Sequence, residues 1–505
     1  MTQFDSILTW TQLVLLAPLA ILGLHRGWMA WLCLRSRHLP ATPPPPADWP
    51  RVTVQLPIFN ERFVAARLIE AVAALDYPRD RLEIQVLDDS TDDTCEIVQR
   101  TLRDLPADLD IAHIRRGNRT GFKAGALAAG LAKAKGEFLA VFDADFVPEP
   151  DFLRRTVPFF ADPRVGMVQA RWEHINPDSR LLTRMQALLL DGHFAVEHVG
   201  RQSRGCFFNF NGTAGVFRRA AIVDAGGWQH DTLTEDMDLS YRAQLQGWRF
   251  VYRPDIACAA ELPVEMRAFL NQQHRWAKGS VQTGRKLLPR ILRAPIPVVA
   301  KIEAVFHLLG NVGFVLLLGV ILIGLPLQIV RLNLPLQMPW LVGFLEGLPL
   351  IFATGSVLVY YGLSQARLSR LDLFVLPRLP VLLALAAGMC INNTAAVCSA
   401  FGRDPGEFTR TPKLDIRKGG NAPQPHALGF LYHSKRGFLP LLELGLGAYA
   451  LATTTLAASQ GHWLTAFYHL LFASGLIWVG GESMARASVA AQPEPVRGEP
   501  SSAHS

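Results

Sequence analysis

The sequence predicts an α/β domain with a mainly parallel sheet, preceded and followed by α-helices that span a membrane. Three observations support this. Between residues 51 and 288, short apolar runs alternate with amphipathic stretches, which is typical of strands joined by crossover helices. Apolar runs of membrane-spanning length lie before and after this region. Half of the 505 residues are hydrophobic, a high share for a wholly soluble protein.

The composition indicates which compartment the α/β domain faces and excludes one class of partner. The formal net charge is +7, but no basic stripe with interleaved aromatic residues is present, and arginines beside membrane segments explain the excess. Nucleic acid is therefore not expected as a partner. The six cysteines show no Cys-x-x-Cys spacing, which argues against a zinc site or a disulfide framework. We expect the α/β domain to face a reducing cytosol.

The first membrane segment is predicted in residues 1–38. Ile7 to Leu24 is a nearly continuous apolar run, and basic residues up to Arg35 follow it while none precedes it. Because cytosolic flanks tend to be positive, the N-terminus should face outward. A cleaved signal peptide is the alternative, but its basic residues would precede the run. Residues 39–50, with Pro43 to Pro46, form a stiff linker.

The domain predicted at 51–288 begins with a parallel βαβ unit. Val52 to Leu56 and Ile84 to Leu87 read as buried strands, and Glu61 to Leu75 reads as the amphipathic helix between them. Ligands bind in such folds at the carboxyl ends of the strands. Polar or acidic residues follow three predicted strands: Glu61 after the first, Asp88 and Asp89 after the second, and Asp143 and Asp145 after a later one.

The last of these pairs is the most informative. Phe138 to Phe142 form a short apolar strand, and Asp143 and Asp145 follow it at alternate positions, which places them on the same side of the chain. Two adjacent carboxylates repel each other unless a proton or a cation lies between them, and hard oxygen ligands suit Mg2+ or Mn2+. Such an ion could carry a substrate diphosphate. The alternative is that both aspartates are solvated and only form a turn, and the neighbouring motifs argue against this alternative.

Two further motifs open helices. In Arg119 to Leu127, a glycine precedes a helix that has Lys123 in its first turns, and a helix N-terminus with a lysine suits a diphosphate. An ordinary surface lysine is the alternative. Thr234, Glu235 and Asp236 begin another helix, although a threonine cap followed by acids is also ordinary helix-start chemistry.

A third helix and a loop complete the pattern. On a helix over Asn271 to Ser280, the side chains of Gln272, Arg275 and Trp276 share one face, where the guanidinium suits a phosphate and the indole suits a sugar ring. Asn209 to Phe217 is a loop of small residues that could let a ligand approach the backbone.

Taken in order, these motifs resemble the signature of the processive family 2 glycosyltransferases, the cellulose synthase superfamily. The motifs are Asp88-Asp89, Asp143-x-Asp145, Thr234-Glu235-Asp236 and Gln272-x-x-Arg275-Trp276. The stretches QVLDDSTDDT, RTGFKAGAL and QQHRW are most similar to the cellulose synthase-like branch, which includes mannan and glucan backbone synthases. The resemblance covers roughly 51–413 and implies a GT-A-like, nucleotide-sugar-binding fold.

The resemblance also implies how the donor is bound. Glu61 and the pair Asp88 and Asp89 would contact the base and the ribose. The resemblance does not indicate which of the two aspartates makes the main contact. Lys123 and Arg275 would hold the diphosphate.

The remaining positions would serve the metal ion and the acceptor. Asp143 and Asp145 would bind the nucleotide and its Mg2+ or Mn2+. Asp236 would be the general base that takes the proton from the acceptor hydroxyl during inversion at the anomeric carbon. Trp276 and Glu235 would contact the acceptor sugar, and Gln272 belongs to the same motif as Trp276.

The chain turns apolar again beyond Leu288. The runs long enough to span a membrane are Val305 to Val330, Leu341 to Leu363, Phe438 to Ala458 and Trp463 to Gly480. They predict transmembrane and interfacial helices in 289–401, a cytosolic loop in 402–437, two further spans in 438–484, and a disordered tail in 485–505. We interpret Leu379 to Phe401 as interfacial or re-entrant, because the basic residues of the following loop argue that this loop stays cytosolic.

Within that loop, Phe408 to Lys413 resembles the gating loop of cellulose synthases, a Phe-x-Val-Thr-x-Lys pattern. Phe408, Thr411 and Lys413 match it, and Arg410 replaces the valine. A plain basic loop beside the membrane is the alternative.

The resemblance therefore implies a multi-pass protein of the plasma or inner membrane that transfers hexose from UDP-glucose or GDP-mannose to a growing β-linked glucan or mannan, with β-1,4 linkage. Its partners would be this donor, the polysaccharide and membrane lipid, and its helices could line an export channel. One alternative is a lipid glycosyltransferase that adds a single sugar, as ceramide glucosyltransferase-like enzymes do. The other is a transporter or scaffold without catalysis, against which the intact Asp143, Asp145, Asp236 and Lys123 argue.

Overall fold

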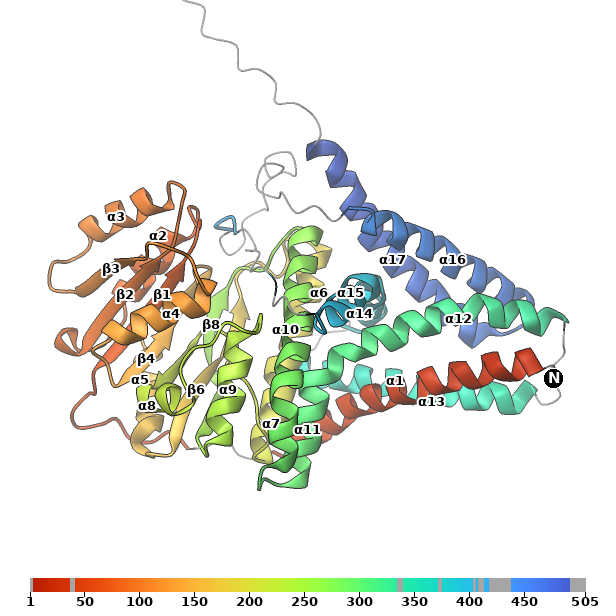
Figure 1. The fold of residues 1–505 in the computed structure, drawn as a ribbon, viewed down its shortest axis with the longest axis horizontal. Helices are drawn as coiled ribbons and strands as arrows, with labels where there is room; N and C mark the ends of the chain where they lie inside the picture. Colours follow the sequence, from red (N-terminus) through yellow and green to blue (C-terminus); the bar gives the residue numbers. More distant parts are fainter. Residues whose placement is uncertain are drawn as a thin grey trace, which may run out of the picture.

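The computed structural model describes residues 3–36, 41–333, 339–370, 375–402, 406, 413–416 and 437–490. An α/β domain lies at one end and a bundle of long helices extends from it (Figure 1). The predicted architecture is confirmed: the α/β domain is enclosed in sequence by apolar helices at both ends.

In the described part of the chain, an eight-stranded sheet forms the centre of the α/β domain, in the order β3-β2-β1-β4-β7-β6-β8-β5. The strands are β1 (Val52–Ile58), β2 (Leu82–Asp88), β3 (Asp110–Arg115), β4 (Phe138–Val141), β5 (Phe146–Pro148), β6 (Val165–His174), β7 (Gly215–Arg218) and β8 (Arg249–Ala260). Four of the seven neighbouring pairs are parallel, among them β1 with both β2 and β4. The ends of these three strands therefore meet at one edge, as the βαβ pattern predicts.

Helices cover both faces of the sheet. They are α2 (Ala65–Ala73), α3 (Thr94–Asp104), α4 (Phe122–Lys133), α5 (Phe152–Thr156), α6 (Leu181–Gly192), α7 (His198–Ser203), α8 (Arg219–Asp224), α9 (Glu235–Leu245) and α10 (Met266–Arg293). Alternation along β4 explains the two layers: Phe138 and Ala140 face the cluster that contains α2, α3 and α5, whereas Leu139 and Val141 face the cluster that contains α4, α8, α9 and α10.

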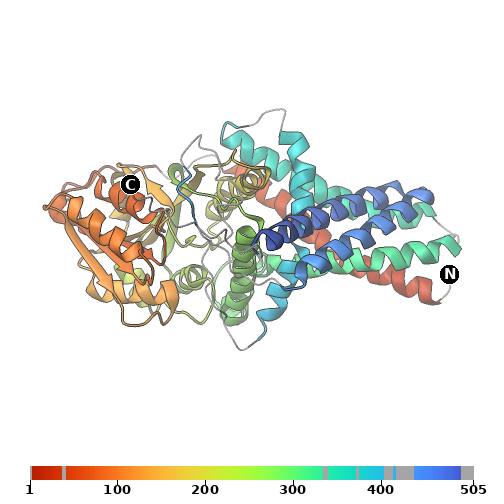
Figure 2. The ribbon, with the colours of Figure 1, turned by 90° about the horizontal axis from the view of Figure 1, so that it is seen from above.

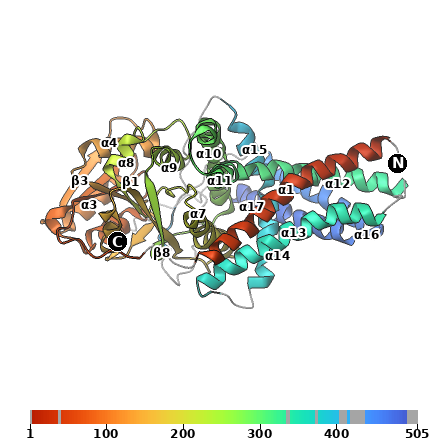
Figure 3. The ribbon, with the colours of Figure 1, turned by 90° about the horizontal axis from the view of Figure 1, so that it is seen from below.

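The helical bundle contains the predicted membrane segments. Its elements are α1 (Gln3–Arg35), α11 (Val298–Leu309), α12 (Gly313–Asn333), α13 (Pro339–Arg367), α14 (Val375–Gly388), α15 (Cys390–Ser399), α16 (Leu439–Ser459) and α17 (Trp463–Ala490). Among the described residues, five segments are long and apolar enough to cross a membrane: Ser6–Arg35, Val298–Leu332, Gly347–Arg367, Leu439–Ser459 and Trp463–Met484. Figures 2 and 3 show α1, α12, α13, α16 and α17 running side by side away from the α/β domain.

The helices α14 and α15 form a pair bent by 44°. Just before α14, Arg370 lies on Asp191 of the α/β domain, and the carbonyl of Ala400, just after α15, accepts a hydrogen bond from Arg285 of α10. Both ends of the pair therefore lie on the side of the α/β domain. A pair with this bend is a broken span or a re-entrant segment, so the re-entrant interpretation of Leu379 to Phe401 stays a prediction.

Two boundaries differ from the sequence prediction. The helix α17 continues to Ala490, past the predicted end at 484, because its last turns are rich in alanine, a strong helix former; 491–505 lie outside the described residues. The loop predicted at 209–217 ends at 214, since Gly215–Arg218 pairs with β4 and β6 as strand β7.

Candidate active site

A cavity opens at the carboxyl ends of β1, β2 and β4 and gathers most of the residues that the sequence predicted. Those that line it are Glu61, Asp89, Lys123, Asp143, Asp145, Glu235, Asp236, Gln272, Arg275, Trp276 and Lys413. They come from segments up to 352 residues apart (413 − 61), which the sheet edge, α9 and α10 bring together. Phe408 and Thr411 lie outside the described residues.

Two lysines neutralise the carboxylates at the end of β4. The ammonium group of Lys123 contacts Asp143, and Lys413 Nζ donates a 2.6 Å hydrogen bond to Asp145 Oδ2. Lys123 also donates to the carbonyl of Gly212, at 2.9 Å. Burial lowers the pKa of Lys123, but Asp143 and the other carboxylates of the cavity outweigh it and raise the pKa overall. The lysine is therefore charged at neutral pH.

The two aspartates that follow β2 point in different directions. Asp88 Oδ2 lies 3.0 Å from His113 Nε2, and Asp88 Oδ1 accepts the backbone N–H of Ser90 at 2.8 Å. Burial raises the pKa of Asp88, but these hydrogen bonds outweigh it and lower the pKa. Asp89 instead lines the cavity, where its carboxylate is held by Arg116. Asp89 is thus placed to contact a ligand, whereas Asp88 lies behind it.

Asp236 begins α9 beside the loop that contains Gly212. A Cβ on residue 212 would lie 3.0 Å from Asp236 Oδ2, and the backbone at this position has a φ of +81°. Both features favour glycine at 212. Burial and the charge of Glu235 raise the pKa of Asp236 to about 7, although Lys123 opposes them. A carboxyl with a pKa near 7 can both accept and release a proton at neutral pH.

The Thr234 hydroxyl does not cap α9. Its oxygen lies 3.3 Å from that of Thr283 on α10, and no side-chain hydrogen bond caps the helix. The close approach requires glycine at 279, because a Cβ there would lie 2.5 Å from Thr234. Ordinary capping therefore does not explain this motif, which instead packs the start of α9 against the helix that carries Arg275 and Trp276.

The loop of residues 209–214 forms the opposite wall. Thr213 Oγ1 accepts the backbone N–H of Asp143 at 2.9 Å. The side chain of Asn211, which lines the cavity, lies 2.9 Å from His193 Nε2 and 2.8 Å from His198 Nε2. Burial and the nearby charge of Arg201 lower the pKa of His193 to about 3, so its ring is neutral. The wall is thus attached to the short π-helix His193–Glu197 and to α7.

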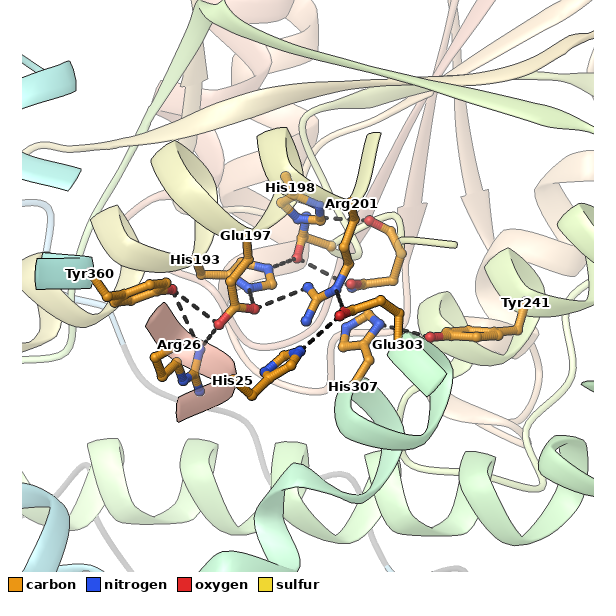
Figure 4. Close-up of polar contacts among 12 residues, drawn as sticks. His25, Arg26, His193, Glu197, His198, Arg201, Tyr241, Glu303, His307 and Tyr360 are labelled. Atoms are coloured by element: carbon orange, nitrogen blue, oxygen red, sulfur yellow. Dashed lines mark hydrogen bonds and ion pairs between the residues drawn. The ribbon is translucent and has the colours of Figure 1, made fainter. Parts of the chain in front are cut away.

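These histidines belong to a buried polar network that joins the α/β domain to the membrane helices (Figure 4). Glu197 is its centre: it contacts Arg26 of α1, accepts a 3.0 Å hydrogen bond from Arg201 and accepts another of 3.0 Å from the Tyr360 hydroxyl of α13. A neighbouring carboxylate, Glu303 of α11, lies 2.9 Å from His25 and 3.7 Å from Arg201. Glu303 therefore takes part in this junction.

Replacing Glu197 by alanine is expected to destabilise the protein, by about 3–5 kcal/mol, because it leaves the buried Arg201 without its closest counter-ion. The measurement is thermal unfolding of the purified protein in detergent. Glu137→Ala is the control, since Glu137 is 56% exposed in its pair with Arg218 and such pairs contribute about 0–1 kcal/mol. Equal melting temperatures for both variants would contradict this account of the junction.

Sequence reasoning missed several residues of the site. Trp172 lines the cavity from β6, and Arg119 stacks on Phe59 with 3.4 Å between the guanidinium carbon and the ring centroid. Trp172 belongs to no pattern that marks it in the sequence, whereas Arg119 begins the RTGFKAGAL motif, in which only Lys123 was assigned a role. Asn211 lies in the loop of small residues, and the composition of this loop was the one sequence signal that indicated a part in the site.

The sheet order and this cavity define the class of the domain, a GT-A-like glycosyltransferase fold. The structure of the mannosyltransferase PcManGT from Pyrobaculum calidifontis, in complex with GDP-Man and Mn2+, superposes with a TM-score of 0.52 at 25% sequence identity, covering 71% of this chain and 98% of that one. Residues 50–279 match the family described as "Glycosyltransferase like family 2". The match spans all eight strands of the described sheet and the first half of α10.

Curated relatives match the same region. Over 253 residues the chain is 49% identical to "Glucomannan 4-beta-mannosyltransferase 2" of Arabidopsis thaliana, which covers 49% of this chain and 47% of the relative. Over 266 residues it is 46% identical to "Glucomannan 4-beta-mannosyltransferase 1" of Oryza sativa subsp. japonica, which covers 51% of each. The chain spans about half the length of the curated relatives it matches.

Proposed function

We propose that the protein is a membrane-embedded, inverting and processive glycosyltransferase that transfers mannose from GDP-mannose to a growing β-1,4-linked polysaccharide. The observation that carries the proposal is the 46–49% identity, over the region that forms the cavity, to proteins named glucomannan 4-beta-mannosyltransferases. The similar structure of PcManGT with bound GDP-Man supports the same donor. UDP-glucose is the competing donor.

The cavity suits a nucleoside diphosphate sugar. Lys123 and Arg275 supply positive charge where the diphosphate would lie, and Asp89 and Glu61 lie toward the ends of β2 and β1, where the base and ribose would bind. Trp276 would stack on the acceptor sugar, and Glu235 lines the same cavity. We assign Asp88 an indirect part, through its position behind Asp89.

Asp143 and Asp145 are proposed to hold the divalent ion, Mg2+ or Mn2+. Two carboxylates lining one cavity are a suitable set of hard oxygen donors, and among the described residues no hydrogen bond engages Asp143 Oδ2 or Asp145 Oδ1. The ion would offset the charge of the leaving diphosphate. Lys123 keeps Asp143 oriented toward the cavity.

Asp236 is proposed as the general base. As the acceptor hydroxyl attacks the anomeric carbon of the donor, its proton passes to the Asp236 carboxylate, the new C–O bond forms, and the bond to the diphosphate breaks. Attack opposite the leaving group inverts the anomeric centre. Gly212 leaves the space beside Asp236 open for the acceptor, and the loop attached through Asn211 forms the wall of that space.

The membrane helices are proposed to place the catalytic domain in the cytosol and to receive the polymer. Arg35 and Arg367 lie together at the ends of α1 and α13 nearest the α/β domain, since Arg367 donates to the carbonyl of Cys33 near the end of α1. Positive charge at these ends favours a cytosolic catalytic domain. A polysaccharide is too polar to cross lipid alone, so we propose that it leaves between the helices.

The test is incorporation of labelled sugar by purified, detergent-solubilised protein, offered GDP-mannose and UDP-glucose separately with Mn2+ or Mg2+. We expect label from GDP-mannose in alcohol-insoluble material that a β-mannanase releases. Label in the organic phase alone would identify a lipid glycosyltransferase instead. Label from UDP-glucose alone would overturn the choice of donor.

A further inference from the structure

Glu261 follows β8 directly and lies behind the site without lining its cavity. Its side chain is buried, and its backbone N–H donates to the carbonyl of Asp145 at 3.4 Å, where β8 pairs with β5. A buried carboxylate needs partners, because an isolated charge is costly to remove from water. The proposed reaction gives Glu261 no part.

The partners of Glu261 are main-chain groups from a distant segment, residues 413–416. Glu261 Oε1 accepts the backbone N–H of Leu414 at 2.7 Å, and Oε2 accepts that of Ile416 at 3.1 Å. Both oxygens of one carboxylate therefore hold alternate residues of a segment that lies more than 150 positions later in the chain.

The same segment brings Lys413 to the cavity. Lys413 Nζ donates to the Glu261 carbonyl and to Asp145 Oδ2, both at 2.6 Å. Arg67 of α2 completes the attachment: it donates to Asp415 at 2.6 Å and lies 3.6 Å from Glu261 Oε2. Charges of both signs thus surround one short stretch of main chain.

We infer that Glu261 is a positioning residue whose buried carboxylate holds the main chain of 413–416, and thereby keeps the Lys413 ammonium at Asp145. This inference rests on the proposed function, in which Asp145 lies beside the metal ion and the leaving diphosphate. Lys413 then adds positive charge at that position, and Glu261 acts only through it.

The structure requires a carboxylate at position 261, because two N–H donors face its two oxygens. Glutamine has the same shape but only one acceptor oxygen, so its NH2 group would face one of the two N–H groups. Glu261→Gln should therefore release part of the segment while leaving the fold in place. Glu83→Gln is the matched control: Glu83 is equally buried in β2, where it accepts hydrogen bonds from Thr53 and Lys135, away from the cavity.

The first test is amide hydrogen exchange of the full-length protein in detergent, followed by mass spectrometry of peptides that contain 413–416. Exchange in these peptides is expected to be faster in Glu261→Gln by about tenfold or more, since a hydrogen bond to a charged group is lost, and unchanged in Glu83→Gln. Wild-type exchange in the peptides of β1 and β2 would show that the fold is intact. If Glu261→Gln does not fold, Leu414→Pro removes one of the two donors from the segment instead. Unchanged exchange around 413–416 would overturn the inference.

The second test is non-additivity of activity. Glu261→Gln and Lys413→Ala are each expected to lower kcat/KM for the donor by about 10- to 100-fold, and the double variant should be no worse than Lys413→Ala alone. Additive losses would show that Glu261 acts independently of Lys413, which would also overturn the inference. The two tests distinguish a failure of the proposed function from a failure of the inference about Glu261. If the wild-type protein has no transferase activity, the proposed function is contradicted. The hydrogen-exchange result still shows whether Glu261 holds the main chain of 413–416.

Discussion

Asp236→Asn is expected to lower the rate of sugar transfer by about 10²–10⁴-fold, because it removes the group that accepts the proton of the acceptor hydroxyl. Asparagine has nearly the same shape, so the packing of α9 on α10 should persist and the affinity for the donor should change little. The measurements are kcat with saturating GDP-mannose and donor binding by calorimetry. Asp224→Asn, an exposed residue at the end of α8, is the control.

The pH dependence of the wild-type protein tests the same assignment. With the pKa of Asp236 at about 7, the carboxyl is protonated below that pH and cannot act as a base. The value of kcat/KM should therefore rise about tenfold per pH unit up to about pH 7 and level off above it. A variant at 236 that retains wild-type turnover, or that fails to bind the donor, would show that this residue has a different role.

Much of the site could be predicted because strand ends in a parallel sheet converge. The apolar runs before Asp89 and Asp143 are unambiguous in the sequence, and parallel neighbours place their carboxyl ends at one edge. The sequence did not distinguish Asp88 from Asp89, because that choice depends on which way each side chain turns. His113, on the neighbouring strand β3, decides it by holding Asp88.

The contacts between distant segments could not be predicted by the same means. Glu197 and Tyr360 are 163 positions apart, and neither lies in a pattern that indicates a partner. Glu261 after a strand resembles any acidic residue at a strand end, and its role depends on main-chain groups of 414 and 416, which carry no sequence signal. Hydropathy located the candidate membrane helices, whereas the polar network that attaches them to the α/β domain follows only from three-dimensional packing.

Removal of divalent ions is expected to abolish transfer, since without them the charge of the leaving diphosphate is offset only by lysine and arginine side chains. Treatment with EDTA should reduce incorporation to background, and excess Mn2+ or Mg2+ should restore it. Asp145→Asn should raise the concentration of Mn2+ needed for half-maximal activity by at least about 10- to 100-fold. Replacing a residue that only hydrogen-bonds to a metal ligand typically has an effect of this size, and Asp145 is proposed as a ligand itself. Asp76→Asn, which alters an exposed pair with Arg154, should leave this concentration unchanged.

Binding of Mn2+ followed by electron paramagnetic resonance, without donor or acceptor, tests the same site independently of activity. Wild-type protein should bind the ion more tightly than Asp145→Asn, even though Lys413 competes for Asp145. Lys413→Ala should therefore bind Mn2+ at least as tightly as wild type in this measurement, because a cation that repels the metal has been removed. Full transferase activity in the presence of EDTA would rule out a metal-dependent reaction and leave Lys123, Arg275 and Lys413 as the groups that offset the diphosphate charge.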